Sequence, residues 1–318
     1  MQEADRSHRP FVYVLVLSYN GRKWLAECVD TLLAMDYPNF RVLVIDNGST
    51  DGTRDYLAER YGDRIDVLWL HENYGYSGGF NHGLVYAFAA KRADYVMVIN
   101  NDTAIDKKAL SALVEVAVTD PMIGFVSGKV YYYDDPKRLQ TCGKSEDPIR
   151  WNGEHIGWKE IDTGAYDEVA ERVFLDDIYC LVSRRVYETV GGYSTTFFLQ
   201  SEEYDWQARA KAKGFRLMYT PHARLWHKES MTIGKDSPLK AFYDARNPMI
   251  VLMLHRSPDY FRRYFRQHAR MVVRRSLVYA KRLRLYSALR VLHGLCSGLY
   301  WGFAHRKLTA RHFIGPAA

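Results

Sequence analysis

Short apolar runs and amphipathic segments alternate along the first hundred residues. Four short, mainly apolar runs lie at 11–17, 41–45, 65–70 and 95–99, and the first is continuous and rich in β-branched residues. Runs of this length predict buried parallel strands. The segments between them carry apolar residues at helical spacing, at 22–35, 54–61 and 78–92. The alternation predicts an α/β fold with a doubly wound, mostly parallel central sheet flanked by helices.

The rest of the chain has a less regular pattern. Residues 131–172 are rich in aromatic, glycine and charged residues, and we expect loops and short strands there. Short helices are expected at 186–190 and 203–213, the second ended by Gly214. After Pro258 the pattern is helical and basic. We therefore expect a polar N-terminal segment, one large domain and a helical appendage, over residues 1–10, 11–250 and 251–318.

The net charge of +7 is unevenly distributed. Residues 260–318 contain 13 Lys and Arg and no Asp or Glu, so residues 1–259 carry 31 basic and 37 acidic residues. A basic amphipathic tail on a mildly acidic body predicts an anionic partner, and we favour an anionic membrane surface. Dimerisation through the tail is one alternative. Nucleic-acid binding is another, although the body contains no recognisable nucleic-acid module.

The N-terminus is polar and no run of about 18 apolar residues occurs, so neither a signal peptide nor a transmembrane helix is expected. The four cysteines are scattered, without a CxxC pair. This pattern disfavours a zinc site or a disulfide framework and is typical of reduced cytosolic thiols. Together with the basic tail, it predicts a cytoplasmic protein held at the inner face of the cell membrane.

Polar side chains follow the second and fourth predicted strands. Asp46 ends the second strand, and Asn100, Asn101 and Asp102 end the fourth. Ligands of open α/β sheets bind beyond the carboxyl ends of the strands. The group after the fourth strand suits Mg²⁺ or Mn²⁺, which would neutralise a diphosphate, and Asp46 suits hydrogen bonding to a base or ribose. The alternative is that these residues only form turns.

A glycine-rich loop and a histidine add two further candidates. Residues 73–81 open a predicted helix, where free backbone N–H groups favour phosphate, and a plain tight turn is the alternative. His227 follows an apolar stretch. It is either a structural histidine or a neutral metal ligand beside Asp102.

Carboxylates are concentrated at the start of the helix predicted near residue 203. Glu202, Glu203 and Asp205 lie within four residues. Crowded carboxylates have a raised pKa, which suits a general base that deprotonates a hydroxyl. The simpler interpretation is that these acids complement the helix dipole on a solvated face.

The joint order of these motifs is more informative than any one of them. The chain resembles the inverting glycosyltransferases of family 2, which have the GT-A fold, and within them a rhamnosyltransferase-like branch with galactofuranosyl transferases as cousins. The matching segments are VLVLSYNG (14–21), VIDNGSTDGT (44–53), NYGYSGGFNHG (73–83), VINNDT (98–103), VGGYSTTFFLQSEEYDWQARAKAKG (190–214), LWHKES (225–230) and YDARN (243–247). The resemblance implies a donor half over residues 11–125 and an acceptor half over residues 126–250.

The resemblance also implies a role for each candidate residue. Asn100 and Asp102 occupy the outer positions of the family's Asp-x-Asp motif, so Asp102, together with His227, would bind Mg²⁺ or Mn²⁺. Glu202 and Glu203 fall on the family's acidic pair, with Glu203 as the general base. The residues implied in sugar-donor binding are Ser18, Asn20, Asp46 (at the nucleobase), Asn73, Gly79, Asn81, Asn100 and Asn101. Those implied near the acceptor or its loop are Asp205, Trp226, Arg246 and Asn247.

The implied reaction is a single displacement that inverts the anomeric configuration. Deoxythymidine-diphosphate rhamnose is the first expectation for the sugar donor and uridine-diphosphate sugars are the second. The acceptor would be a glycan or lipid-linked hydroxyl in surface polysaccharide synthesis. A galactofuranosyl- or other hexosyltransferase is the alternative within the family. Outside the family, a nucleotidyltransferase would need a glycine-rich basic signature after the first strand, and this signature is absent. The remaining alternative is a basic-tailed nucleotide- or nucleic-acid-binding protein without transferase activity.

Overall fold

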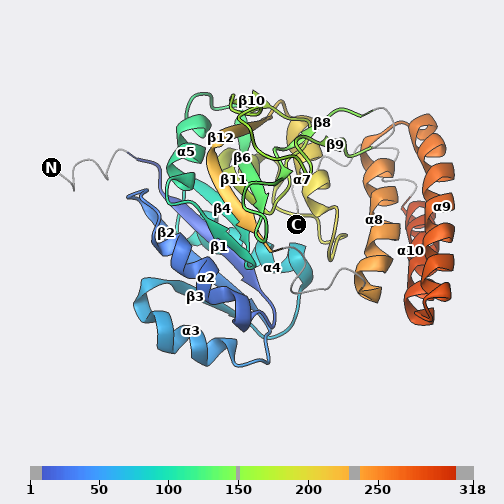
Figure 1. Cartoon of the computed structure of the whole chain (residues 1–318), viewed down its shortest axis with the longest axis horizontal. Coiled ribbons are helices and arrows are strands. Elements are labelled where there is room, and N and C mark those ends of the chain that lie inside the picture. The colour runs from blue at the N-terminus through green and yellow to red at the C-terminus, as the bar shows by residue number, and fades with distance from the viewer. Residues whose placement is uncertain (1–8, 148–150, 229–236, 306–318) are drawn as a thin grey trace.

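The computed structural model describes residues 9–147, 151–228 and 237–305. A central sheet lies between two layers of helices, and three further helices form a separate layer beside it (Figure 1). In chain order the elements are β1 (Val12–Ser18), α2 (Arg22–Leu33), β2 (Phe40–Asn47), α3 (Thr53–Tyr61), η1 (Gly62–Arg64), β3 (Asp66–Leu70), α4 (Gly75–Leu84), η2 (Val85–Ala90), β4 (Tyr95–Asn100), β5 (Thr103–Ile105), α5 (Ala109–Ala117), β6 (Ile123–Tyr132), β7 (Leu139–Thr141), β8 (Lys144–Ser145), β9 (Glu154–His155), β10 (Ala170–Glu171), β11 (Tyr179–Ser183), α6 (Arg184–Val190), α7 (Glu202–Lys211), β12 (Arg216–His227), α8 (Pro238–His255), α9 (Pro258–Lys281) and α10 (Leu285–Ala304).

The first four strands form a parallel half-sheet. Strand β1 pairs in parallel with both β2 and β4, and β2 pairs in parallel with β3. All four strands lie where the apolar runs predicted them, and α2 and α3 lie in two of the three predicted helical segments. The third predicted helix, 78–92, begins three residues earlier, as α4, and ends in the π-helical turn η2. The predicted α/β fold is confirmed.

The second half of the sheet is mixed. The strand order is β10-β12-β6-β11-β4-β1-β2-β3, and β11 runs antiparallel to both β4 and β6. The start of β11 therefore lies at the same edge of the sheet as the carboxyl end of β4. Neither this strand nor β6, β12 or α5 was predicted from the sequence pattern, whereas the short strands β7, β8, β9 and β10 lie in the segment expected to be irregular.

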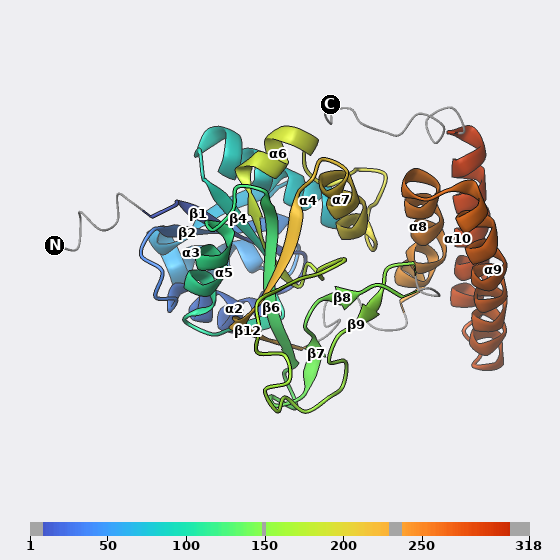
Figure 2. The ribbon, with the colours of Figure 1, turned by 90° about the horizontal axis from the view of Figure 1, so that it is seen from above.

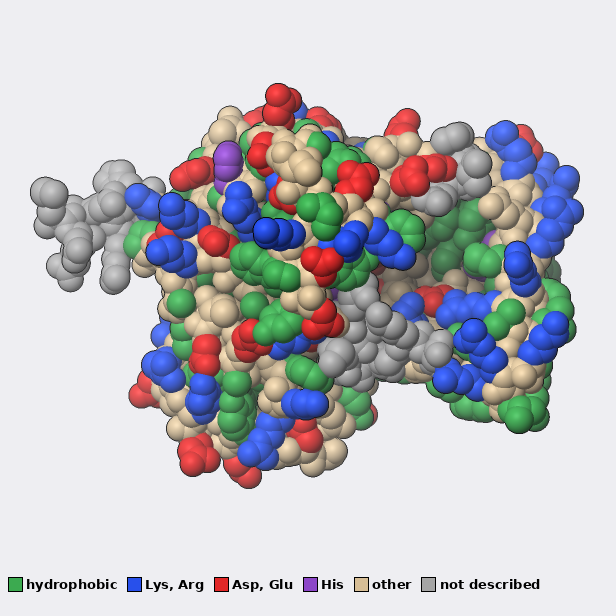
Figure 3. Space-filling model, viewed as in Figure 1, with side chains coloured by type: hydrophobic (Ala, Val, Ile, Leu, Met, Phe, Trp, Pro, Cys, Tyr) green, Lys and Arg blue, Asp and Glu red, His purple; other side chains and the backbone are tan. Residues whose placement is uncertain are grey.

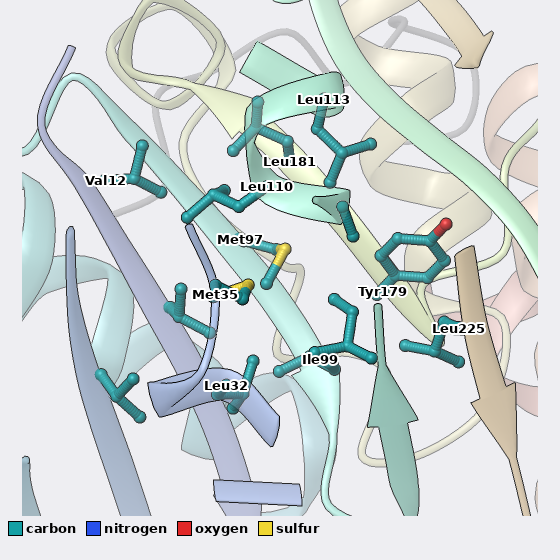
Figure 4. Close-up of a cluster of buried hydrophobic side chains, with 14 of the residues drawn as sticks. Val12, Leu32, Met35, Met97, Ile99, Leu110, Leu113, Tyr179, Leu181 and Leu225 are labelled. Carbon is teal, nitrogen blue, oxygen red and sulfur yellow. The ribbon is translucent and has the colours of Figure 1, made fainter. Parts of the chain in front are cut away.

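Both faces of the sheet are buried, as the continuous apolar runs require. In β1, Val12, Val14 and Val16 belong to the cluster that packs under α2, α3 and α5, whereas Tyr13 and Leu15 belong to the cluster under α4, α6 and α7. Figure 4 shows part of the first cluster, where side chains of α2 and α5 meet the sheet. Each fully buried aliphatic side chain stabilises the fold by about 1.5 to 3 kcal/mol, so the edge of the sheet is a rigid support for the loops that follow its strands.

The C-terminal helices form the layer beside the sheet, and α8 is its inner member (Figure 2). The tail predicted to be helical after Pro258 is helical, but it folds back on itself as the pair α9 and α10. The turn between them includes Leu283, which has a φ of 58°. Helix α8 runs through residue 250, where the domain boundary is predicted, and that boundary stays a prediction. No helix in the described ranges is both long and apolar enough to cross a membrane.

A row of glycines lets α10 approach α8 closely. Gly294, Gly298 and Gly302 follow one another at four-residue spacing on the side of α10 that faces α8. A Cβ at Gly298 would lie 3.1 Å from the backbone oxygen of Arg246, and a Cβ at Gly294 would collide with the backbone oxygen of Phe242. A larger residue at Gly294 would therefore displace the backbone of α8, whereas at Gly302 a Cβ would meet only the side chain of Met253.

Candidate functional site

The loops after β1 and β2 are joined at the carboxyl edge of the sheet. Ser18 lies opposite Asp46 in the register of the two strands. The Asn20 side chain accepts a hydrogen bond from the backbone N–H of Thr50 at 2.8 Å, and its own backbone N–H donates to Ser49 Oγ at 2.9 Å. Asp46 is buried and accepts from the backbone N–H of Ser49 at 3.1 Å. Three residues predicted to bind the sugar donor are thus brought together, and Asp46 also shapes the turn after its strand.

Asp102 and His227 meet at the same edge, although they are far apart in sequence. Asp102 follows β4, and His227 ends β12, where it lies opposite Thr103. His227 Nε2 lies 3.3 Å from Asp102 Oδ1, and both side chains are more than nine-tenths buried. Beside them, Asn101 donates to Ser18 Oγ at 3.3 Å. The structure therefore places the two predicted metal ligands in contact, and their role as ligands stays a prediction.

The chemistry of this pair fits a divalent cation. The other ring nitrogen of His227, Nδ1, lies 3.0 Å from Gln140 Oε1. An amide oxygen can only accept, so Nδ1 is the donor of this contact, and Nε2 is the ring atom that faces Asp102. An imidazole lone pair next to a carboxylate oxygen is a suitable donor set for a divalent ion such as Mn²⁺.

A second cluster consists of three carboxylates. Asp177 lies just before β11, and Glu202 and Glu203 begin α7. One carboxylate oxygen from each of the three lies within 4.8 Å of the other two. Glu202 is 3% exposed, and its Oε2 has no hydrogen-bond partner among the residues that the structure describes. Like charges this close are stable only if they share a proton, a cation or a polar ligand.

The surroundings raise the pKa of all three carboxyls. Burial raises the pKa of Glu203 well above its ordinary value, and the charge of Asp177 adds to this while Lys144 opposes it. Burial followed by the charges of Glu203 and Asp177 raises the pKa of Glu202 in the same direction. Burial, with the charge of Asp176, raises the pKa of Asp177 to about 6. A carboxyl with a raised pKa is a stronger base once ionised, as a general base requires.

One tyrosine reaches from the metal motif to the carboxylate cluster, and a second supports that cluster. The Tyr76 hydroxyl lies 3.4 Å from Asn100 Oδ1 and 3.2 Å from the backbone oxygen of Asp177. The Tyr193 hydroxyl donates to Asp177 Oδ2 at 3.2 Å. Asn100 belongs to the predicted metal motif, so one side chain, Tyr76, reaches from that motif to the carboxylate cluster. The residues predicted to bind metal and to act as base therefore lie on the same edge of the sheet.

The glycine-rich segment 73–81 starts as a turn, continues as the first part of α4 and is held by its own polar side chains. Asn73 Oδ1 accepts a backbone N–H of the same turn at 2.8 Å. Gly79 packs on the sheet, where any Cβ would press against the side chain of Leu17. The Asn81 amide donates to and accepts from the backbone of Tyr193, at 2.8 and 2.9 Å. These bonds support the tight-turn interpretation, and a contact of Asn73, Gly79 or Asn81 with the sugar donor stays a prediction.

Two of the residues expected near the acceptor tie elements together. Asp205 is buried and accepts hydrogen bonds from Arg209 Nε at 2.9 Å and from His255 Nε2 at 2.8 Å. Trp226 is half-buried and stacks on Tyr131 with ring centroids 5.8 Å apart. Both side chains have structural partners in the fold, and their contact with an acceptor stays a prediction.

The other two, Arg246 and Asn247, lie on α8 and hold the loop that leads to α7. Arg246 donates to the backbone oxygen of Thr196 at 3.1 Å. The Asn247 amide donates to the backbone oxygens of Leu199 and Gln200, each at 2.7 Å.

Sequence reasoning missed several residues of this edge. Asp177 was not singled out, although an acid pair directly before a buried strand was a usable signal. Its neighbour Asp176 accepts from Thr141 at 3.0 Å and lies 3.5 Å from the buried Lys144. Burial alone would raise the pKa of Asp176, but Lys144 and a hydrogen bond from His155 lower it overall. This network borders Glu203, and no periodicity in its segment indicated it.

Comparison with known proteins identifies the family. The family described as Glycosyl transferase family 2 matches residues 13–171, half of the chain. The chain belongs to glycosyl transferase family 2. The range matched by family 2 contains Asp46 and Asp102, whereas Glu203 and His227 lie beyond it.

Three relatives in other organisms are similar to this chain over part of their length. An uncharacterized protein, y4gI, of Sinorhizobium fredii is 27% identical over 81% of this chain and 28% of its own length. The O-antigen biosynthesis protein RfbC of Myxococcus xanthus is 27% identical over 74% of this chain and 18% of its own. The putative teichuronic acid biosynthesis glycosyltransferase TuaG of Bacillus subtilis is 33% identical over 34% of this chain and 42% of its own. The chain thus spans less than half the length of each of these relatives.

Solved structures agree on the fold. One is the mannosyltransferase PcManGT from Pyrobaculum calidifontis, in complex with GDP-Man and Mn²⁺. Its superposition covers 96% of this chain and 85% of the mannosyltransferase chain, with a TM-score of 0.53 and 18% sequence identity. GalNAc-T7 with UDP, GalNAc and Mn²⁺ covers 96% of this chain and 59% of its own with a TM-score of 0.61 and 13% identity. The GT-A fold expected from the sequence is confirmed.

Proposed function

We propose that the protein is an inverting glycosyltransferase that moves a sugar from a nucleoside-diphosphate sugar to a hydroxyl of a glycan or lipid-linked acceptor. The observation that supports this most directly is the position of the Asp102–His227 pair and the Glu202–Glu203–Asp177 cluster on one sheet edge. Tyr76 reaches from Asn100 to the backbone of Asp177 along that edge. One cluster suits a diphosphate with its cation, and the other suits a hydroxyl that must lose its proton.

In the proposed reaction Glu203 accepts the proton of the acceptor hydroxyl. The acceptor oxygen then forms a bond to the anomeric carbon while the bond from that carbon to the diphosphate oxygen breaks, which inverts the configuration. Asp102 and His227 would hold Mg²⁺ or Mn²⁺, whose charge stabilises the leaving diphosphate. Asp177 keeps the basicity of Glu203 high because its negative charge opposes the ionisation of Glu203. No side chain has to act as a nucleophile.

For the sugar donor we propose a deoxyhexose or hexose nucleotide, with rhamnose first, and for the pathway the synthesis of a surface polysaccharide. Two relatives carry names from O-antigen and teichuronic acid biosynthesis. The two solved structures were determined with GDP-Man or UDP together with Mn²⁺, which supports a nucleotide sugar with a divalent ion as the substrate form.

A panel of nucleotide sugars tests the proposal. The purified protein is incubated with each sugar nucleotide and with Mn²⁺ or Mg²⁺, and its thermal unfolding is recorded. We expect one nucleotide series to raise the melting temperature only when the cation is present. Product from the stabilising donor should then have the opposite anomeric configuration. Stabilisation by no nucleotide under any cation condition would contradict the proposal.

We also propose that the α9–α10 pair binds an anionic membrane surface on the cytoplasmic side. Apolar side chains are exposed around the turn of the pair, and Lys and Arg side chains lie along its outer edge (Figure 3). The exposed apolar residues of this turn are Leu277, Val278, Leu283, Leu285, Tyr286 and Leu289. Apolar contact with lipid, with roughly 1 kcal/mol from each basic residue near an anionic surface, is sufficient for peripheral binding.

Vesicle flotation tests the membrane proposal. We expect the protein to float with vesicles that contain anionic lipid at low salt and to be released at high salt. Leu277→Asp combined with Leu285→Asp should abolish flotation. The matched control is Val118→Asp, which places a charge at an exposed apolar position of the catalytic domain instead. Equal flotation of both variants would show that the turn is not the contact surface.

A further inference from the structure

The acidic pair Glu202–Glu203 follows a strained stretch of backbone. Gln200 and Ser201 have φ angles of 69° and 73°, so two consecutive residues other than glycine occupy the left-handed region. This conformation is costly for side chains with a Cβ and persists only when surrounding contacts impose it. Ser201 is also the N-cap residue of α7, and its side chain makes no capping hydrogen bond. Contacts from outside α7 must therefore fix where its first turn begins.

Asn247 of α8 supplies the main contact. It is fully buried, and its Nδ2 donates to the backbone oxygens of both Leu199 and Gln200 at 2.7 Å. Both hydrogens of the amide are thus used on consecutive carbonyl groups at the strained point. Arg246 donates to Asn247 Oδ1 at 2.8 Å, which fixes the orientation of the amide.

Further contacts hold the same segment from both sides. On the sugar-donor side, the backbone N–H of Tyr76 donates to the oxygen of Phe198 at 2.7 Å. On the far side, His255 at the end of α8 bonds to Asp205 in the first turn of α7. The segment before Glu202 is therefore held between the loop that opens α4 and helix α8.

We propose that Asn247 is a positioning residue for the general base, and that α8 is part of the catalytic apparatus through it. By imposing the left-handed pair Gln200–Ser201, Asn247 sets the direction in which Glu203 leaves the loop. The inference rests on the proposed function, in which Glu203 deprotonates the acceptor. A displacement of about 1 Å at a reacting group lowers turnover by about 100-fold, so loss of Asn247 should reduce kcat without weakening sugar-donor binding.

The experiment combines removal of the amide with relief of the strain. We expect Asn247→Ala to lower kcat by about 10- to 100-fold while the KM for the sugar donor changes less than about twofold. Glycine adopts the left-handed region without strain. Adding Gln200→Gly and Ser201→Gly to Asn247→Ala should therefore recover at least about threefold of kcat. The matched control is Asn39→Ala. It removes a hydrogen bond from an asparagine side chain to the backbone oxygen of Arg9, at the start of β2 and away from the carboxyl edge of the sheet.

Three outcomes would overturn the proposal: kcat of Asn247→Ala equal to that of the wild type, parallel loss of kcat and sugar-donor affinity, or no recovery with the glycines. If Asn247→Ala does not fold, Asn247→Ser, which keeps one donor, replaces it and should show a smaller loss of kcat. Hydrogen exchange gives a readout without activity. Amides 199–205 should exchange at least about tenfold faster in Asn247→Ala than in Asn39→Ala, and equal rates would refute the clamp even if the wild type proves to have no transferase activity.

Discussion

The two polar clusters at the sheet edge are built on opposite electrostatic plans. Asp102 and His227 are unlike groups in contact, with the second nitrogen of the histidine bonded to Gln140. Glu202, Glu203 and Asp177 are like groups in contact, and the first of them has a buried oxygen without a partner among the described residues. The first cluster therefore costs the folded protein little free energy. In the second, repulsion between like charges raises the pKa of the carboxyls and favours uptake of a proton.

The largest effect is expected from breaking the first cluster. Asp102→Ala should lower kcat/KM by about 10³-fold, because the carboxylate stabilises charge at the leaving diphosphate through its cation. Calorimetric titration with the sugar nucleotide and Mn²⁺ should show no cation-dependent binding. The control is Glu59→Ala, which removes an exposed carboxylate of α3. Unchanged calorimetric affinity of Asp102→Ala would remove this residue from the metal site.

A smaller loss is expected from neutralising the base in the second cluster. Glu203→Gln should lower kcat by about 10²-fold, since the amide cannot accept the hydroxyl proton. The affinity for the sugar nucleotide should be retained, which separates this variant from Asp102→Ala in the same calorimetric assay. Glu202→Gln is the matched control and should keep far more activity. Near-normal turnover in Glu203→Gln would show that another group is the base.

The crowding of charges can be tested by pH. Asp177→Asn removes a negative charge beside Glu203, so the pKa of Glu203 should fall and the acidic limb of the kcat profile should move to lower pH by about one unit. The profile is measured at saturating sugar donor, with Asp55→Asn, an exposed acid of α3, as control. A shift to higher pH, or none, would mean that Asp177 does not act on the base.

The smallest effect concerns stability. The pKa of Asp177 is raised to about 6 in the folded protein, so its contribution to stability is fully present below its unfolded pKa, near 4, and is lost as pH rises through 6. Asp177→Asn keeps an acceptor for Tyr193 and should therefore be more stable than the wild type by about 1 to 2 kcal/mol at pH 8. The difference should vanish near pH 4. Denaturant unfolding at both pH values measures it, and a destabilised variant at pH 8 would contradict this account.

The sequence predicted those parts of the site that follow parallel strands. Asp46 and Asp102 come directly after continuous apolar runs, and the carboxyl ends of parallel strands share one edge, so their proximity could be inferred without coordinates. Asp177 could not be placed in this way. It precedes an antiparallel strand, β11, and an antiparallel strand brings its first residues, not its last, to that edge.

The C-terminal region shows a different limit of prediction. Its helical pattern was recognised, but the reversal at Leu283 depends on a left-handed residue that is not glycine, which no turn signal marks. Asn247 was assigned to the acceptor region through family resemblance alone. Its two hydrogen bonds, to the backbone oxygens of Leu199 and Gln200, join segments separated by almost fifty residues. Local propensity contains no information about such a contact.

The glycine row of α10 has a practical consequence for exchanging parts between relatives. Gly298 packs against the backbone of Arg246, next to the residue that holds the loop before α7. A chimera whose last helix has a larger residue at this position would press that side chain against Met249 and the backbone of Arg246. Crossovers placed before residue 190 move the loop, α7, α8 and the glycine row as one block, and this is where a hybrid enzyme should be joined.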